Sequence, residues 1–256
     1  MNKIQISLLI VSLWVISCSS GPKETKESPA VVEGTTALPE VAPLPVTFLP
    51  VDSLTLFPDA ILELNTPLSN QVFKPGKVPF EFNIKNFSLK TKGVAAPRLQ
   101  MILNGGGPEG FSAPIFQREL ARGTYRTVAF LVDQKGLSLK NFGNYLDRDF
   151  LVGDSRPFPY SAEPYLAINL PKNEQIVPFG QDLILDFLVL GGDLKLDGLK
   201  VKIWINAYQT ETNAMVPLRV SNLPVGDYQV KVQLLRTTNK ELEGPFSSST
   251  KTIYVR

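Results

Sequence analysis

The sequence of 256 residues has no histidine and a single cysteine, Cys18. Histidine is the usual general base near neutral pH, the partner of serine and cysteine nucleophiles, and the commonest metal ligand. Its absence therefore excludes most hydrolase chemistries and most transition-metal sites. With one cysteine the chain also has no internal disulfide. We expect no catalytic residue, no metal site and no cofactor.

The apolar run at the amino terminus is short for a membrane span. It extends from Ile4 to Ile16 after Lys3, whereas a transmembrane helix needs about 20 apolar residues. Its length, its basic flank and its position are typical of a secretory signal peptide. An anchor helix that stays in place is the alternative.

The cysteine follows this run directly, in the order Val15-Ile16-Ser17-Cys18. An aliphatic residue, a second hydrophobe, a small residue and then cysteine resemble the lipobox of bacterial lipoproteins. The resemblance implies that residues 1–17 are cleaved as a signal peptide and that Cys18 carries acyl chains, palmitate among them. Each buried methylene of such a chain contributes about 0.8 kcal/mol to membrane binding. A free thiol behind an ordinary signal peptide is the alternative.

The residue after the cysteine bears on sorting within the cell envelope. Ser19 resembles the residue found in lipoproteins that pass to the outer membrane, since retention in the inner membrane is commonly linked to Asp at this place. We expect a lipid-anchored protein of the outer membrane, on its periplasmic or its surface-exposed face. Nucleic acid is not an expected partner of an exported chain with a net charge of +2.

Residues 18–58 differ in composition from the rest of the chain. They are rich in proline, which lacks an N–H donor and has a fixed φ, so we expect a disordered, extended linker there. Over residues 18–60, 2 lysines stand against 6 acidic residues. The segment is therefore interpreted as a solvated spacer, and a surface-export tag at 23–27 is the alternative.

The body of the chain contains an internal repeat. The segment Ile61-Leu62-Glu63-Leu64-Asn65-Thr66-Pro67 recurs as Tyr165-Leu166-Ala167-Ile168-Asn169-Leu170-Pro171. Further matches follow in the same order along both copies, which indicates two tandem copies of one domain.

In each copy, apolar residues alternate with others over short segments bounded by glycine and proline. This period of two is typical of strands with one buried face, and no segment after residue 60 shows a helical stripe. Copies of about 95 residues built from short strands predict antiparallel β-sandwiches. We therefore expect an all-β chain with Ig-like sandwiches at 59–153 and 164–256, joined by a linker at 154–163.

One motif is more specific than the alternation. Leu-x-x-Gly-x-Tyr precedes an alternating strand in both copies and places Tyr125 and Tyr228 at the same point. This resembles the tyrosine corner of immunoglobulin-like and fibronectin type III-like domains, in which the hydroxyl bonds to an upstream backbone group. The disulfide of many such domains is missing, and Trp204 has no Trp counterpart in the first copy. The sandwich subtype therefore stays open.

Candidate binding residues come from the less regular stretches of the first copy, at 104–118 and 135–148. Phe111, Phe116, Phe142 and Tyr145 lie there, and loop tips on a rigid sandwich commonly carry recognition. Packing in the core is the alternative. The first copy is also basic, with 12 Lys and Arg against 7 Asp and Glu over residues 61–153, whereas residues 154–256 contain 11 of each. An anionic glycan would be attracted to such a charge.

Two carboxylate pairs are the remaining candidates for chemistry: Glu63 with Glu81, and Asp193 with Asp197. Their spacing does not require catalysis. A calcium site is the alternative for the set Asp182, Asp186, Asp193 and Asp197, but a calcium loop needs a denser alternation of acidic residues. We therefore expect a non-enzymatic, lipid-anchored envelope protein for adhesion, glycan binding or envelope assembly, whose partner is a glycan or an envelope or host protein. The alternatives are a periplasmic-facing module that joins other envelope proteins and, more remotely, a carboxylate-based glycan hydrolase.

Overall fold

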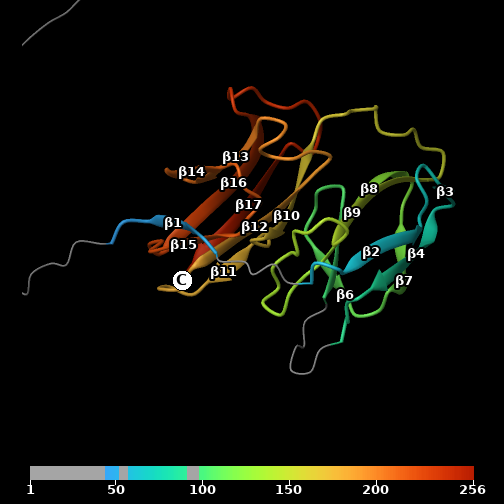
Figure 1. The fold of residues 1–256 in the computed structure, drawn as a ribbon, viewed down its shortest axis with the longest axis horizontal. Coiled ribbons are helices and arrows are strands. Elements are labelled where there is room, and N and C mark those ends of the chain that lie inside the picture. The colour runs from blue at the N-terminus through green and yellow to red at the C-terminus, as the bar shows by residue number, and fades with distance from the viewer. Residues whose placement is uncertain (1–43, 52–56, 91–97) are drawn as a thin grey trace, which may run out of the picture. The chain divides into compact units, whose positions relative to one another are not determined.

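The computed structural model describes residues 44–51, 57–90 and 98–256, and every regular element in them is a β-strand. The described residues contain no helix, and so none that is long and apolar enough to cross a membrane. The predicted all-β class is confirmed, because these strands form stacked sheets in which most strand pairs are antiparallel and two are parallel (Figure 1). Cys18 and the rest of residues 1–43 lie outside the described residues.

The first sandwich consists of a three-stranded sheet in the order β2-β4-β7 and a five-stranded sheet in the order β3-β9-β8-β5-β6. Phe80 and Phe150 are fully buried between the two sheets, with ring centroids 5.7 Å apart. The strands are β2 (Ile61–Thr66), β3 (Val72–Phe73), β4 (Gly76–Lys85), β5 (Leu99–Leu103), β6 (Glu109–Phe111), β7 (Ile115–Leu120), β8 (Gly123–Leu131) and β9 (Tyr145–Val152).

The second sandwich has the same topology with one strand more. Its sheets run in the orders β1-β15-β12-β10 and β11-β17-β16-β13-β14. The strands are β1 (Thr47–Pro50), β10 (Tyr165–Leu170), β11 (Gln175–Val177), β12 (Leu183–Leu190), β13 (Leu199–Ile205), β14 (Tyr208–Thr212), β15 (Leu218–Ser221), β16 (Gly226–Arg236) and β17 (Ser248–Val255).

The two copies agree in detail. In each, a cis X-Pro bond follows the first strand, at Pro67 and at Pro171. Tyr125 donates its hydroxyl to the carbonyl of Ala121 at 3.0 Å, and Tyr228 donates to the carbonyl of Pro224 at 2.9 Å. Both bonds run four residues upstream along the backbone, which is the form of a tyrosine corner.

Strand β1 lies in the segment that the sequence analysis assigns to the proline-rich linker. It pairs antiparallel with β15 of the second sandwich, from Thr47 opposite Ser221 to Pro50 opposite Leu218. Phe48 packs against the second core. Burial of this apolar side chain favours the strand over the extended coil expected for a proline-rich segment. Because Pro50 is the last strand residue, its missing N–H interrupts no inner ladder bond.

Candidate functional site at the junction of the two sandwiches

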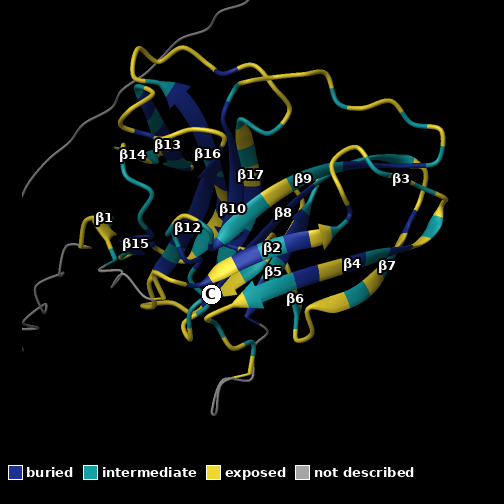
Figure 2. Ribbon diagram, turned by 45° about the vertical axis from the view of Figure 1, so that its right-hand side comes forward, coloured by how far each residue is buried: buried dark blue, intermediate teal, exposed yellow. Residues whose placement is uncertain are grey.

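Pro43–Arg256 forms one unit, and within it the sandwiches meet through the outer faces of two sheets. Successive side chains of a strand point to opposite faces. In β8 and in β10 and β12 both faces are apolar, so one face packs in its own core and the other against the neighbouring sandwich (Figure 2). We call this contact the junction. Its buried apolar residues are Ile102, Val128, Phe130 and Val132 from the first sandwich and Tyr165, Ala167, Leu188 and Leu190 from the second.

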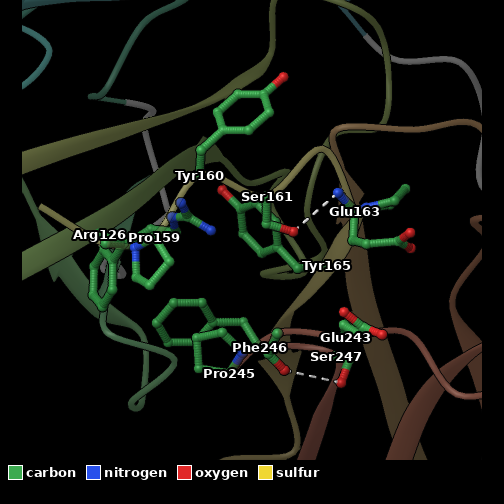
Figure 3. A pocket seen from close by; sticks show the side chains of 13 residues that line it. Arg126, Pro159, Tyr160, Ser161, Glu163, Tyr165, Glu243, Pro245, Phe246 and Ser247 are labelled. Carbon is green, nitrogen blue, oxygen red and sulfur yellow. Dashed lines mark hydrogen bonds between the residues drawn. The ribbon is translucent and has the colours of Figure 1, made fainter.

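A pocket of about 260 Å³ opens at one end of the junction, and we call it the junction pocket. The interdomain linker, the loop before β17 and one side chain of β8 line it. Figure 3 shows Arg126 and Pro159 on one side and Glu163 and Glu243 on the other, with the rings of Tyr165 and Phe246 between them. Its aromatic rings are Phe158, Tyr160, Tyr165 and Phe246.

Arg126 is held inside an aromatic cage. Its guanidinium lies 4.7 Å from the ring centroid of Tyr165 and 5.5 Å from those of Phe158 and Phe246. It also donates two hydrogen bonds to the carboxylate of Asp149, at 2.7 and 2.6 Å. These bonds raise the pKa of Arg126. The arginine is therefore a fixed wall of the pocket, because a bidentate pair and stacked rings restrict its rotation.

Tyr165 is fixed in the same way. Its hydroxyl donates a hydrogen bond to Asp147 at 2.7 Å, and burial raises the pKa of this phenol far above its ordinary value. The ring of Tyr165 lies 6.1 Å from that of Phe246, and the ring of Phe158 lies 5.8 Å from Phe246 in an edge-to-face contact. The aromatic wall is therefore largely preformed.

The opposite side of the pocket offers polar groups. Arg236 donates to both oxygens of Glu163, at 2.8 and 2.7 Å. Glu243 also lines the pocket, and within the described part of the chain no ion pair involves its carboxylate. A cavity with rigid aromatic walls and a few polar groups is suited to a ligand that is apolar on its faces and polar at its edges.

A polar cluster lies farther along the same outer faces, and we call it the clasp. Its centre is Asp186 of β12, whose side chain is 0% exposed. The Asp186 carboxylate accepts from the backbone N–H of Ser138 at 2.7 Å, from Lys140 Nζ at 2.5 Å and from Asn169 Nδ2 at 2.7 Å. Ser138 Oγ also contacts both carboxylate oxygens. Residues of the first sandwich therefore neutralise a carboxylate of the second.

Lys140 reaches the clasp from the loop between β8 and β9. Its side chain is 16% exposed, and it also donates to the hydroxyl of Ser138 and to the carbonyl of Phe187. Desolvation lowers the pKa of Lys140, and the charge of Asp186 opposes this shift. Breaking a buried pair of this kind costs more than breaking an exposed one, because the remaining charge stays desolvated.

The structure brings two of the four candidate binding residues together. Phe111 of β6 and Phe116 of β7 stack with ring centroids 3.7 Å apart, and both pack against the first core. Phe142 is 99% exposed, whereas Tyr145 packs at the junction. Phe111 and Phe116 therefore span the two sheets of the sandwich, and neither lines the junction pocket.

One member of each carboxylate pair considered from the sequence is held by hydrogen bonds. Glu63 accepts from Asn83 at 2.7 Å and from Lys85 at 3.0 Å, and these bonds lower the pKa of Glu63. Asp193 accepts from two backbone N–H groups of its own turn, which lower its pKa. Both carboxyls thus favour the ionised form, whereas a general acid needs the protonated one.

Trp204 lies on the outer face of the second sandwich. Lys202 and Lys231 place their ammonium groups 5.1 and 5.0 Å from its ring centroid. These cation–π contacts pack the partly buried ring of Trp204 against side chains of its own and the neighbouring strand.

Sequence reasoning missed the pocket and the clasp, and it considered Asp186 only as a possible calcium ligand. Arg126 and Phe246 are far apart in the chain, and a single sequence carries no signal that they meet. The available signal was the absence of polar alternation in Tyr165–Leu170 and Leu183–Leu190, because a strand that is apolar on both faces must be covered twice.

No family model and no curated protein matches the chain. Fibronectin(III)-like modules of CbhA from Clostridium thermocellum are 12% identical over 77% of this chain and 94% of that chain, with a TM-score of 0.30. Three N-terminal domains of the Highly Immunogenic Outer Capsid protein of bacteriophage RB49 are 11% identical over 77% and 69%, with a TM-score of 0.23. A protein described as membrane anchored, from Corynebacterium diphtheriae, is 12% identical over 77% and 53%, with a TM-score of 0.30. The description of the sandwiches rests on the strand order of this chain and not on these matches.

Proposed function

We propose that this chain is a lipid-anchored, non-enzymatic protein of the bacterial cell envelope, and that its paired sandwiches bind a glycan in the junction pocket. The observation that carries the binding role is the pocket itself, with fixed rings on one side and carboxylates on the other. The lipobox-like segment before Cys18 supports the anchoring.

The chemistry of the pocket favours a saccharide over other ligands. A pyranose ring has apolar C–H faces that stack on aromatic rings and hydroxyl groups at its edge that hydrogen-bond with carboxylates. Phe158 and Phe246, which are only partly buried, offer the stacking surface, while Glu163 and Glu243 offer acceptors. A strongly anionic ligand is disfavoured, because Asp149 already neutralises Arg126.

Titration calorimetry tests glycan binding with the purified chain and a panel of soluble oligosaccharides, beginning with N-acetylglucosamine oligomers. We expect saturable binding to at least one of them and about a tenfold weaker affinity for Phe246→Ala, which corresponds to about 1.4 kcal/mol. Phe142→Ala is the matched control, since this ring is fully exposed and does not line the pocket. The absence of saturable binding across the panel would reject the glycan role.

Anchoring and membrane face need separate experiments. Metabolic labelling with a palmitate analogue should mark the wild-type chain and not Cys18→Ser, and the variant should move to the aqueous phase of a detergent partition. Protease added to intact cells, with a periplasmic protein as lysis control, distinguishes a surface-exposed body from a periplasmic one. An unlabelled wild-type chain would contradict the lipoprotein assignment.

One observation favours the second candidate, a module that joins another envelope protein. Strand β14 ends its sheet, and the edge of a sheet offers backbone groups to which a partner strand can pair. Cross-linking in cells to one stoichiometric protein, without oligosaccharide binding, would support this candidate in place of the glycan binder.

A further inference from the structure

The repeat places an amide and a carboxylate side by side in both sandwiches, but in different surroundings. Asn169 and Asp186 are buried in the second sandwich, whereas their counterparts Asn65 and Glu81 are exposed in the first. Only the buried pair faces a lysine of the neighbouring sandwich among the described residues, and that lysine is Lys140. The clasp therefore holds an amine, an amide and a shared carboxylate.

The geometry of the clasp brings the reacting groups onto one carboxylate. Lys140 Nζ lies 2.5 Å from Asp186 Oδ1, and Asn169 Nδ2 lies 2.7 Å from Asp186 Oδ2. The amine and the amide are thus neighbours on the two oxygens of a single proton acceptor. Asn169 is further oriented by a hydrogen bond of 2.8 Å from its Nδ2 to the carbonyl of Gly136.

We propose that Lys140 and Asn169 become joined by a covalent amide bond, with Asp186 transferring the protons. A bond forms between Lys140 Nζ and Asn169 Cγ, and the bond between Asn169 Cγ and Nδ2 breaks. The lysine nitrogen loses two protons, which pass by way of Asp186 to the leaving nitrogen. The products are a secondary amide and an ammonium ion, Asp186 is ionised again at the end, and no oxidant or other co-reactant is required.

The surroundings of the clasp suit this step. Desolvation lowers the pKa of Lys140, which increases the share of the neutral, nucleophilic amine. Asp186 is fully buried and Asn169 is 4% exposed, so competing water is largely excluded from the amide carbon. Fixing both groups on the two oxygens of Asp186 replaces a bimolecular encounter by an intramolecular one, which accelerates a slow reaction strongly.

The bond would join the two sandwiches covalently, because Lys140 belongs to the first and Asn169 to the second. The junction would then stay closed under a pulling force or in denaturant, where hydrogen bonds and apolar contacts open. In a tethered envelope protein, the bond would also hold the walls of the junction pocket in place relative to each other.

Peptide mapping of the full wild-type chain tests the proposal without any variant. The protein is denatured, digested with trypsin and analysed by mass spectrometry. We expect a linked pair of peptides, one with Lys140 and one with Asn169, whose mass is the sum of the two minus one ammonia. Recovery of both peptides only in their unlinked form from folded wild-type protein would overturn the proposal.

Three variants assign the roles. Lys140→Arg removes the nucleophile and Asp186→Asn removes the proton acceptor, and we expect the linked peptide to be lost in both. Glu81→Gln is the matched control at the counterpart of Asp186, and it should keep the link at the wild-type level. Circular dichroism verifies that each variant is folded; a link that survives in a folded Lys140→Arg protein would contradict the assignment of the nucleophile.

Discussion

The two sandwiches share one strand order, yet they differ in which outer faces are apolar. On β8 of the first sandwich the outward residues include Val128 and Phe130, whereas the counterparts on β16 of the second are Lys231 and Gln233. On the opposite sheets the situation reverses, since Ala167 of β10 corresponds to Glu63 of β2. At these positions each copy is apolar where it meets the other and polar where it does not.

This difference shows how a duplicated domain becomes a two-domain unit. The inner faces keep the same alternation in both copies, because each sandwich needs its own core. The outer faces are unconstrained by the fold and have diverged into a junction on one side and a solvated surface on the other. The clasp follows the same rule, as Asn169 and Asp186 correspond to exposed residues in the first sandwich.

The largest expected effect comes from removing an apolar side chain at the junction. Phe130 is fully buried at the junction, and we expect Phe130→Ala to lower the free energy of unfolding by about 3–5 kcal/mol. Gln233 occupies the same place in the second sandwich and donates to Glu241 at 2.9 Å, so Gln233→Ala should cost only about 1 kcal/mol. Denaturant titration of both variants measures the difference. Equal losses would show that the outer faces are not energetically distinct.

The next comparison concerns a sheet edge. Strand β1 covers β15 in the second sandwich, whereas β7, the counterpart of β15, ends its sheet in the first. Hydrogen exchange should therefore protect the amides of Leu218–Ser221 more than the outward amides of Ile115–Leu120. Phe48→Ala removes the side chain that holds β1, and we expect a loss of about 1–2 kcal/mol and faster exchange in β15.

Leu49→Ala serves as control for the edge, because Leu49 is 45% exposed and its removal should leave exchange in β15 unchanged. Protection of β15 that persists in Phe48→Ala would mean that β1 contributes little to this sheet.

The sequence was sufficient for the elements that repeat. Alternation in segments such as Gly76–Lys85 and the paired tyrosines at 125 and 228 predicted strands and sandwiches, because inner-face packing leaves a period of two. It was insufficient for β1, because the four residues Thr47–Pro50 are too few to show a period. Their pairing with β15 depends on a surface that forms only after the second sandwich folds.

The candidate site was harder to predict for a related reason. Phe111 and Phe116 were predicted as binding residues because they are aromatic and lie in irregular stretches. In the structure they stack on each other and pack against the first core. The pocket instead uses Arg126 and Phe246, which lie within or beside ordinary strands and meet only through the junction. The buried Asp186 in an otherwise apolar strand was the strongest local signal, since a buried carboxylate needs partners.

The two tyrosine corners allow the sandwiches to be compared at matching positions, with a smaller expected loss of stability. Both hydroxyls bond to a carbonyl upstream, but Tyr228 is only 7% exposed and Tyr125 is partly exposed. We expect Tyr228→Phe to cost about 1 kcal/mol and Tyr125→Phe less, because an unmet carbonyl near water is solvated again. Denaturant titration measures both, with Tyr160→Phe as control at a ring that is 95% exposed. A greater loss for Tyr125→Phe would reverse the argument.

The smallest effect concerns Glu63, which lies on the face of β2 that corresponds to the junction face of β10. Lys85 and Asn83 lower the pKa of Glu63 below the ordinary value of 4.5. A carboxyl with a lowered pKa stabilises the fold above its unfolded pKa, and this contribution disappears as the pH falls through the folded pKa. Glu63→Gln should therefore lower the Tm slightly at neutral pH and match the wild type at a pH below the folded pKa of Glu63.

Because Glu63 and Lys85 are exposed to solvent, added salt should reduce the Tm difference further. A Tm difference that persists in acid would assign the role of Glu63 to packing rather than to charge, and the outer face of the first sandwich would then resemble the junction more closely than its exposure suggests.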